Sequence, residues 1–134
     1  MIRVENRTHR RLEMKLSAGV AIVSSILGFL AWKPEFQCRT QDASAQGMKL
    51  FSNRPIPEGS DVKLWVSVPN DTRKKALKLR GRVCWAASHD VRGAFLAGVC
   101  LASQPARSVT AWKKLIYERV RKDYRDPIPV GVIQ

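Results

Sequence analysis

With 134 residues, the chain has room for one compact domain, and its 45% hydrophobic residues are enough to build a core, which excludes disorder as the default. It carries 24 lysines and arginines against 11 aspartates and glutamates, a formal net charge of +13. Basic domains of this size meet polyanions such as nucleic acid, nucleotides, phosphorylated groups or anionic lipid, although most single charges only solvate the surface.

The cysteines give information about the cellular compartment rather than about a functional site. Cys38, Cys84 and Cys100 form no CxxC pair, and the last two lie in apolar runs. Unpaired cysteines often behave as small buried hydrophobes, so we expect three reduced thiols in a cytoplasmic protein. A zinc site is not expected, because the spacing is wrong and the only histidines are His9 and His89.

The chain begins with a polar and basic segment, residues 1–15, which we interpret as an arm leading into the first strand. The next 17 residues, Leu16–Trp32, carry no charge, and about 17 apolar residues is the lower limit for a membrane span. Two strands joined near Ser24 and Ser25 are the alternative, since Val20 and its neighbours are rich in side chains that branch at Cβ. We expect strands here, and no signal peptide, because no small-residue cleavage site closes the segment.

Alternating apolar and polar residues predict further strands, separated by turns rich in proline, glycine and aspartate. The predicted strands are Phe36–Arg39, Met48–Phe51, Val62–Val68, Leu77–Val83 and Ala94–Leu101. The predicted turns are Asp42–Gly47, Arg54–Gly59, Pro69–Asp71 and His89–Gly93. Several short strands with regular turns predict a closed or nearly closed β-barrel over residues 12–104.

The pattern changes at Pro105. From there to Asp123 the chain has no glycine and no internal proline, and apolar residues such as Val109 and Trp112 recur at helical spacing. We therefore predict one C-terminal helix over residues 105–124, with Ser103 or Ser108 as its cap and a tail from 125 to 134.

Two short motifs connect this architecture to a known family. Arg7-Thr8-His9-Arg10-Arg11 matches RxxxR, and Asp42-Ala43-Ser44-Ala45-Gln46-Gly47 matches (D/N)xSxxG. In this order, at the start of a predicted barrel, they make the chain resemble the PilZ domain family. Gly81-Arg82-Val83-Cys84-Trp85 and Gly98-Val99 extend the resemblance, which covers roughly residues 5–124. It implies a six-stranded antiparallel β-barrel with a C-terminal α-helix, and cyclic di-GMP as ligand.

The resemblance assigns the ligand site residue by residue. Arg7 and Arg11, with Arg10 as a secondary candidate, would wrap the ligand, because a guanidinium binds phosphate or guanine through paired hydrogen bonds and also stacks on purines. Asp42 would accept hydrogen bonds from guanine N1–H and N2–H. Ser44 would add a hydroxyl, and Gly47 would give room for a turn or a close ligand. Taken alone, the second motif also fits a tight turn held by its own Asp and Ser side chains.

Two departures from the family pattern concern affinity and partners. Asn6 stands where many members carry a second arginine, which weakens one expected phosphate or guanine contact. The 30 residues from Leu12 to Gln41 that separate the motifs are unusually apolar, which allows an exposed surface for a partner. If both motifs bind one ligand they lie on one side of any membrane, so a span between them is excluded.

Other functions are less well supported. No nucleophile with a base, metal-spaced cluster or phosphate-binding glycine loop is evident, so we expect no enzyme and no cofactor. A nucleic-acid-binding small barrel would suit the charge, but requires basic and aromatic residues along one exposed sheet face, whereas the strands show single charges between apolar residues. We therefore expect no DNA partner. A ligand-free adaptor with the same fold is a third possibility.

The output is expected to pass through an unidentified effector protein. The surfaces proposed for it are the ordered arm and a basic helix face of Lys113, Lys114 and Arg121. Trp65, Trp85 and Trp112 are expected to pack in the core or at a barrel end, with Trp65 on the polar side of its strand.

Overall fold

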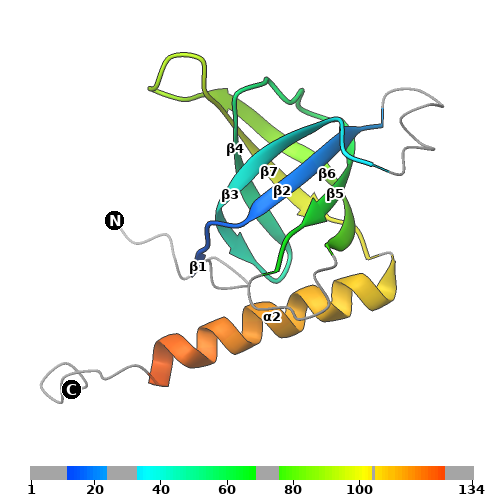
Figure 1. Ribbon diagram of the computed structural model, residues 1–134, viewed down its shortest axis with the longest axis vertical. Coiled ribbons are helices and arrows are strands. Elements are labelled where there is room, and N and C mark those ends of the chain that lie inside the picture. Colours follow the sequence, from blue (N-terminus) through cyan, green and yellow to red (C-terminus); the bar gives the residue numbers. More distant parts are fainter. Residues whose placement is uncertain (1–11, 24–32, 69–75, 104, 126–134) are drawn as a thin grey trace, which may run out of the picture.

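The computed structural model describes residues 12–23, 33–68, 76–103 and 105–125 (Figure 1). Arg7, Arg10 and Arg11, together with Asn6, lie outside the described residues, as do the second half of the apolar segment and the tail after residue 125. The ligand-binding arm predicted from the first motif therefore stays a prediction, and the second motif falls wholly within the described part.

The described residues form one antiparallel β-sheet that closes on itself, and one helix (Figure 1). Around the barrel the strands follow the order β3-β2-β5-β6-β7-β4, and β4 pairs again with β3. A short β1 adds to the end of β3. The elements are β1 Leu12–Glu13, β2 Ser17–Ile22, β3 Phe36–Ser44, β4 Gly47–Ser52, β5 Asp61–Val66, β6 Leu77–Ser88, β7 Phe95–Leu101 and α2 Ala106–Arg125. The predicted six-stranded barrel with a C-terminal helix is confirmed.

The first part of the apolar segment forms β2, as predicted. It lies between β3 and β5, and Ala18 and Val20 point into the core with no exposed surface. Val23 continues the pairing by donating its N–H to the carbonyl of Asp61 at 2.8 Å. In the described part of the chain, no helix has the length and hydrophobicity that a membrane crossing requires.

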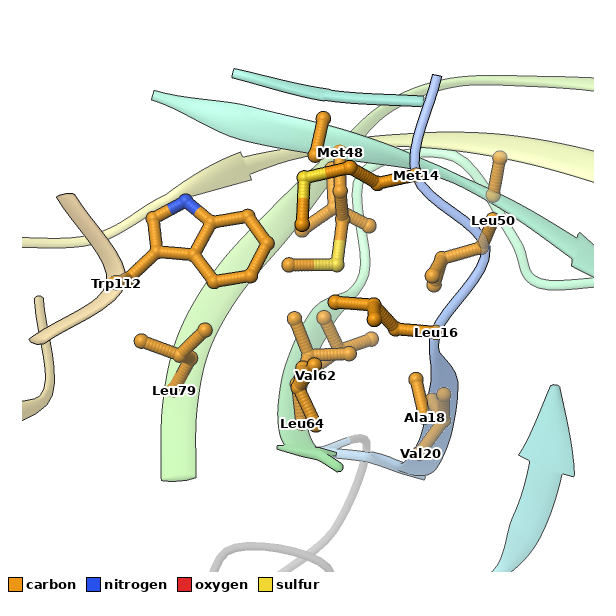
Figure 2. Close-up of a cluster of buried hydrophobic side chains, with 14 of the residues drawn as sticks. Met14, Leu16, Ala18, Val20, Met48, Leu50, Val62, Leu64, Leu79 and Trp112 are labelled. Carbon is orange, nitrogen blue, oxygen red and sulfur yellow. The ribbon is translucent and has the colours of Figure 1, made fainter. Parts of the chain in front are cut away.

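The barrel interior is filled by inward-facing side chains from every strand, and the helix covers one end (Figures 1 and 2). Trp112 of α2 enters that end and lies beside Leu79, with Met14 and Met48 across from it; Ala18 lies toward the other end (Figure 2). Trp112 has no exposed surface, so its predicted place in the core is confirmed.

The cysteine prediction is wrong for two of the three residues. Cys84 of β6 and Cys100 of β7 are joined by a disulfide on the outer surface of the barrel. The β6–β7 register shifts between Val83 and Trp85, which leaves Cys84 as the extra residue of a β-bulge beside Cys100. Bulges depend on the partner strand, so the separation of these cysteines along the chain did not indicate their pairing.

Cys38 remains a free thiol, and burial raises its pKa from 9.0 to about 12. Because only the thiolate is nucleophilic, we expect iodoacetamide at pH 8 to leave Cys38 unmodified in the folded protein, and to label Cys84 and Cys100 only after reduction. Mass spectrometry of the peptides checks this. Above pH 9 the unfolded chain loses the Cys38 proton first, so this thiol's contribution to stability falls as the pH rises toward 12. Rapid labelling of Cys38 at pH 8 would contradict its burial.

Candidate functional site

The Asp42–Gly47 motif forms the tip of a β-hairpin. We predicted that a strand would end at Arg39 and that a polar turn would follow, but β3 runs on to Ser44 and β4 begins at Gly47. Ser44 pairs with Gly47, so Ala45 and Gln46 alone make the loop. Two-residue loops hold the register of both strands closely, which fixes the positions of Asp42 and Ser44.

A β-bulge determines that Asp42 points outward. The β3–β4 register shifts between Thr40 and Asp42, so Gln41 is the additional residue. Thr40 is buried with no exposed surface, and strict alternation would also turn Asp42 inward. With one residue inserted the phase changes, and Ala43 enters the core while the Asp42 carboxylate lies at the surface, 3.5 Å from Nζ of Lys49.

Ser44 is nearly buried and is held from two directions. Its Oγ accepts a hydrogen bond from the N–H of Gln46 at 3.3 Å, which tightens the loop. Its carbonyl oxygen accepts a hydrogen bond from Nε1 of Trp112 at 2.9 Å. In the contact with Gln46 the Ser44 hydroxyl acts only as an acceptor, so its hydrogen does not take part in holding the loop. The hairpin tip is therefore bonded directly to the C-terminal helix.

Gly47 has a packing role in the structure. A Cβ at this position would lie 2.3 Å from the carbonyl oxygen of Val99 on β7, which is part of the backbone and cannot move aside. Because the backbones of β4 and β7 approach so closely, only glycine fits here. The predicted role of Gly47 in admitting the ligand stays a prediction.

Beyond the motif, a row of outward-facing residues crosses four strands. Asp42 of β3 pairs with Lys49 of β4, Lys49 pairs with Gly98 of β7, and Gly98 pairs with Trp85 of β6. The Trp85 indole lies directly over Gly98, since a Cβ there would be 2.0 Å from Nε1. Gly98 thus lets a half-buried indole lie flat on the barrel, beside a carboxylate and an ammonium group.

A second row lies next to the first. The guanidinium of Arg39 lies 5.5 Å from the ring centre of Phe51, and the ring of His89 meets Phe51 edge-on at 5.0 Å. Arg39 pairs with Phe51 across β3 and β4. The outer face of β3, β4, β7 and β6 therefore combines cationic groups with half-buried aromatic rings, the set of groups that binds phosphates and bases.

Thr40 connects the start of the chain to this face. Its buried hydroxyl donates to the carbonyl of Met14 and accepts from the N–H of Leu16 at 2.8 Å. Met14 also donates its N–H to the carbonyl of Gln41 at 3.1 Å. Together with the pairing of Leu12 to Ala43, these bonds fix the segment that follows Arg11 along the motif strand.

The structure thus brings Asp42, Ser44 and Gly47 together at one hairpin tip. It adds residues that the sequence did not single out for a site: Lys49, Arg39, Thr40 and Gly98. Trp85 was expected to pack in the core or at a barrel end, but its indole lies on the outer face. The positions of Gly98 and Trp85 in the sequence do not indicate that the indole lies on the outer face, because their contact depends on the β6–β7 register.

Comparison with known proteins places the chain in a family. The profile of the PilZ domain family matches residues 5–118, whereas a search of curated proteins found no significant match. The PilZ domain of Escherichia coli YcgR, solved with cyclic di-GMP, superposes with a TM-score of 0.62 at 13% identity, over 91% of this chain and 98% of that one.

Two further structures share the fold. A tetrameric PilZ domain protein from Xanthomonas campestris has a TM-score of 0.64 at 16% identity, over 89% of this chain and 90% of that chain. The inhibitor of motility MotI/DgrA from Bacillus subtilis has a TM-score of 0.64 at 12% identity; the match covers 87% of this chain but only 51% of that protein. With the family profile matching residues 5–118 and the barrel shared with these proteins, the chain belongs to the PilZ domain family.

Proposed function

We propose that this protein is a non-enzymatic cyclic di-GMP receptor that binds the dinucleotide between the arm carrying Arg7 and Arg11 and the outer face of β3, β4, β7 and β6. The observation that carries the proposal is the outward row of Asp42, Lys49 and Trp85. It places an acceptor for guanine, a cation for phosphate and a flat ring next to each other. YcgR, with the same fold, was solved with this ligand.

The Asp42–Lys49 ion pair would open when ligand binds. The carboxylate of Asp42 would accept from guanine N1–H and N2–H, and Lys49 would turn to a phosphate. Both side chains are about one-quarter exposed, at 23% and 28%. Because the pair is mostly buried, the ligand has to replace it with contacts of similar strength, a guanine edge for Asp42 and a phosphate for Lys49.

Trp85 would supply a stacking surface for a guanine. Its indole is fixed over Gly98, so the ring is oriented before the ligand arrives. Stacking of a base on an aromatic side chain contributes about 1–3 kcal/mol. Preorganisation of the ring avoids part of the entropy that binding otherwise loses.

Arg7 and Arg11 would close over the ligand from the other side, with Arg10 as a further contact. Leu12, the residue after Arg11, pairs with Ala43 inside the second motif. This pairing attaches the arm beside the second motif, where its arginines would contact the ligand. Guanidinium groups can bind both phosphate and guanine.

The signal would pass to a protein partner through the helix. Trp112 bonds the carbonyl of Ser44, so α2 senses the position of the hairpin tip. Lys113, Lys114 and Arg121 are exposed on α2 and would form the surface that an effector contacts.

We also propose a cytoplasmic location, where reduction would open the exposed Cys84–Cys100 disulfide.

Calorimetric titration of site variants tests this proposal. We expect Arg7→Ala, Arg11→Ala and Asp42→Ala each to weaken cyclic di-GMP binding about 10- to 100-fold, because each loses hydrogen bonds in which the protein group is charged. Ser44→Ala and Trp85→Leu are expected to weaken it about tenfold. Circular dichroism establishes that each variant is folded.

Arg107→Ala serves as the matched control, since this exposed arginine in the first turn of α2 is not among the residues of the proposed site, and its loss removes the same charge. We expect it to keep the affinity of the unaltered protein. If Arg107→Ala weakens binding as much as Arg11→Ala, the effect is one of net charge and the proposed site is wrong.

A further inference from the structure

A second charged surface lies on the outer side of β5 and β6. Along β5 the outward residues include Lys63 and Trp65, and along β6 they include Lys78, Arg80 and Arg82. We refer to these five residues as the β5–β6 face. Three of the cations are exposed, while Lys63 and Trp65 are half-buried.

The register brings these residues into one patch. Lys63 pairs directly with Arg80, and Trp65 pairs with Lys78. Two cationic groups side by side raise the local positive potential, which attracts phosphate groups. Arg82 is paired with the carboxylate of Asp61, with Nε and Oδ1 3.1 Å apart. The single charges that the sequence shows between apolar residues therefore gather on one exposed face of the barrel.

The face is hollowed in two adjoining places. A hollow of about 490 Å³ lies among Lys63, Arg80, Arg82 and the Asp61 that pairs with Arg82, with apolar walls that include Leu101. A second, of about 300 Å³, lies along Trp65 and Lys78 and shares Lys63 and Arg80 with the first. Two neighbouring hollows that share the cations Lys63 and Arg80, with an indole in one of them, suit phosphates and bases that follow each other along a strand.

This face is centred on different strands from the cyclic di-GMP site proposed above. Around the barrel, β2 lies between β3 and β5, and β7 lies between β4 and β6. The β3–β4 hairpin and the β5–β6 pair thus occupy opposite sides of the six-stranded barrel (Figure 1). The two surfaces meet on β6, where Arg82 and Trp85 both face outward on either side of the β-bulge at Cys84. The residues that belong to the β5–β6 face alone are those paired across these two strands, Lys63 with Arg80 and Trp65 with Lys78.

We propose that the β5–β6 face binds single-stranded nucleic acid. Its cations would contact the phosphate backbone, and Trp65 would stack on a base, without selecting a sequence. A barrel with a basic groove and an aromatic ring is the arrangement that binds single strands through charge and stacking. An acidic protein would use the same charges but would not need a half-buried indole beside a hollow.

Fluorescence anisotropy with labelled oligo(dT) and oligo(U) of about 12 nucleotides tests the proposal. We expect saturable binding that weakens with salt. If four cations contact phosphates, log K falls with log salt with a slope of about −3. The triple variant Lys63→Gln, Lys78→Gln, Arg80→Gln is expected to bind at least tenfold more weakly, and Trp65→Leu about tenfold more weakly at unchanged charge.

The matched control removes three charges elsewhere: Lys113→Gln, Lys114→Gln, Arg121→Gln on α2. It has the same net charge as the β5–β6 triple variant, and we expect it to bind oligonucleotide nearly as well as the unaltered protein. Equal weakening in both triple variants would mean charge alone and would overturn the proposal. The proposal would also fail on a second outcome, in which Trp65→Leu binds as well as the unaltered protein and polyglutamate with the same number of charges displaces the oligonucleotide. That outcome would assign the face to an acidic protein.

Titration with cyclic di-GMP keeps this test independent of the receptor proposal. The β5–β6 triple variant is expected to retain the cyclic di-GMP affinity of the unaltered protein, which also shows that its barrel is intact. A protein that binds no oligonucleotide can still bind cyclic di-GMP, and a protein that binds no cyclic di-GMP can still bind the oligonucleotide. The two proposals can therefore fail separately.

Discussion

Replacing Trp112 with alanine is expected to lower the free energy of unfolding by about 3–5 kcal/mol, the range for removing a large buried aromatic side chain. Trp112 has no exposed surface and closes one end of the barrel beside Leu79 and Met48 (Figure 2). Its removal opens a cavity that the surrounding strands cannot fill, because the closed sheet fixes their positions. Urea denaturation followed by circular dichroism measures the change.

Two variants of the same helix separate packing from hydrogen bonding. Trp112→Phe keeps a ring in the core but leaves the carbonyl of Ser44 without its indole donor, so we expect a loss of about 1–2 kcal/mol and weaker cyclic di-GMP binding. Tyr117→Ala removes an aromatic residue that is 65% exposed, and we expect almost no change in stability. A Trp112→Phe variant with unaltered cyclic di-GMP affinity would show that α2 and the hairpin tip act independently.

Gly47→Ala is expected to destabilise the fold by about 3 kcal/mol and to abolish detectable cyclic di-GMP binding. The new methyl group would lie 2.3 Å from the carbonyl oxygen of Val99, so β4 has to move away from β7. That movement shifts Ser44, which pairs with Gly47, and with it the acceptor and donor groups of the motif. Thermal unfolding and calorimetric titration measure the two effects.

Neighbouring substitutions provide the comparison. Gln46→Ala alters an exposed residue of the same loop and is expected to leave both stability and affinity nearly unchanged. Gly98→Ala would collide with the Trp85 indole, a side chain that can swing away. We therefore expect Gly98→Ala to lose only about 1 kcal/mol of stability but to weaken cyclic di-GMP binding like Trp85→Leu. If Gly47→Ala is as stable as the unaltered protein, the close approach of β4 and β7 is wrong.

Local patterns in the sequence predicted most of the barrel. Apolar residues at alternate positions from Val62 onward indicated β5, and the change to helical spacing at Val109 indicated α2, because each pattern reflects one element and one buried face. The motif Asp42–Gly47 was found for the same reason, since its residues are contiguous. Its strand boundaries were missed, because the two-residue loop has the same polar composition as a longer turn.

Features that depend on strand pairing could not be predicted in this way. The β-bulge at Gln41, which turns Asp42 outward, exists only relative to β4, and the bulge at Cys84 only relative to β7. The same holds for the β5–β6 face: Lys63 and Arg80 are far apart in the sequence and become neighbours through the register. The sequence argued against a basic aromatic surface, because each strand alone carries isolated charges. Pairing of β5 with β6 places those charges side by side.

Calorimetric titration of the unaltered protein with cyclic di-GMP tests the receptor proposal most directly. We expect saturable heat with cyclic di-GMP and much weaker heat with GMP, because GMP brings one guanine and one phosphate where cyclic di-GMP brings two of each. The same titration with Arg11→Ala is expected to give weak heat or none. A folded protein that gives no heat with cyclic di-GMP would contradict the receptor function and leave a PilZ barrel that serves another partner.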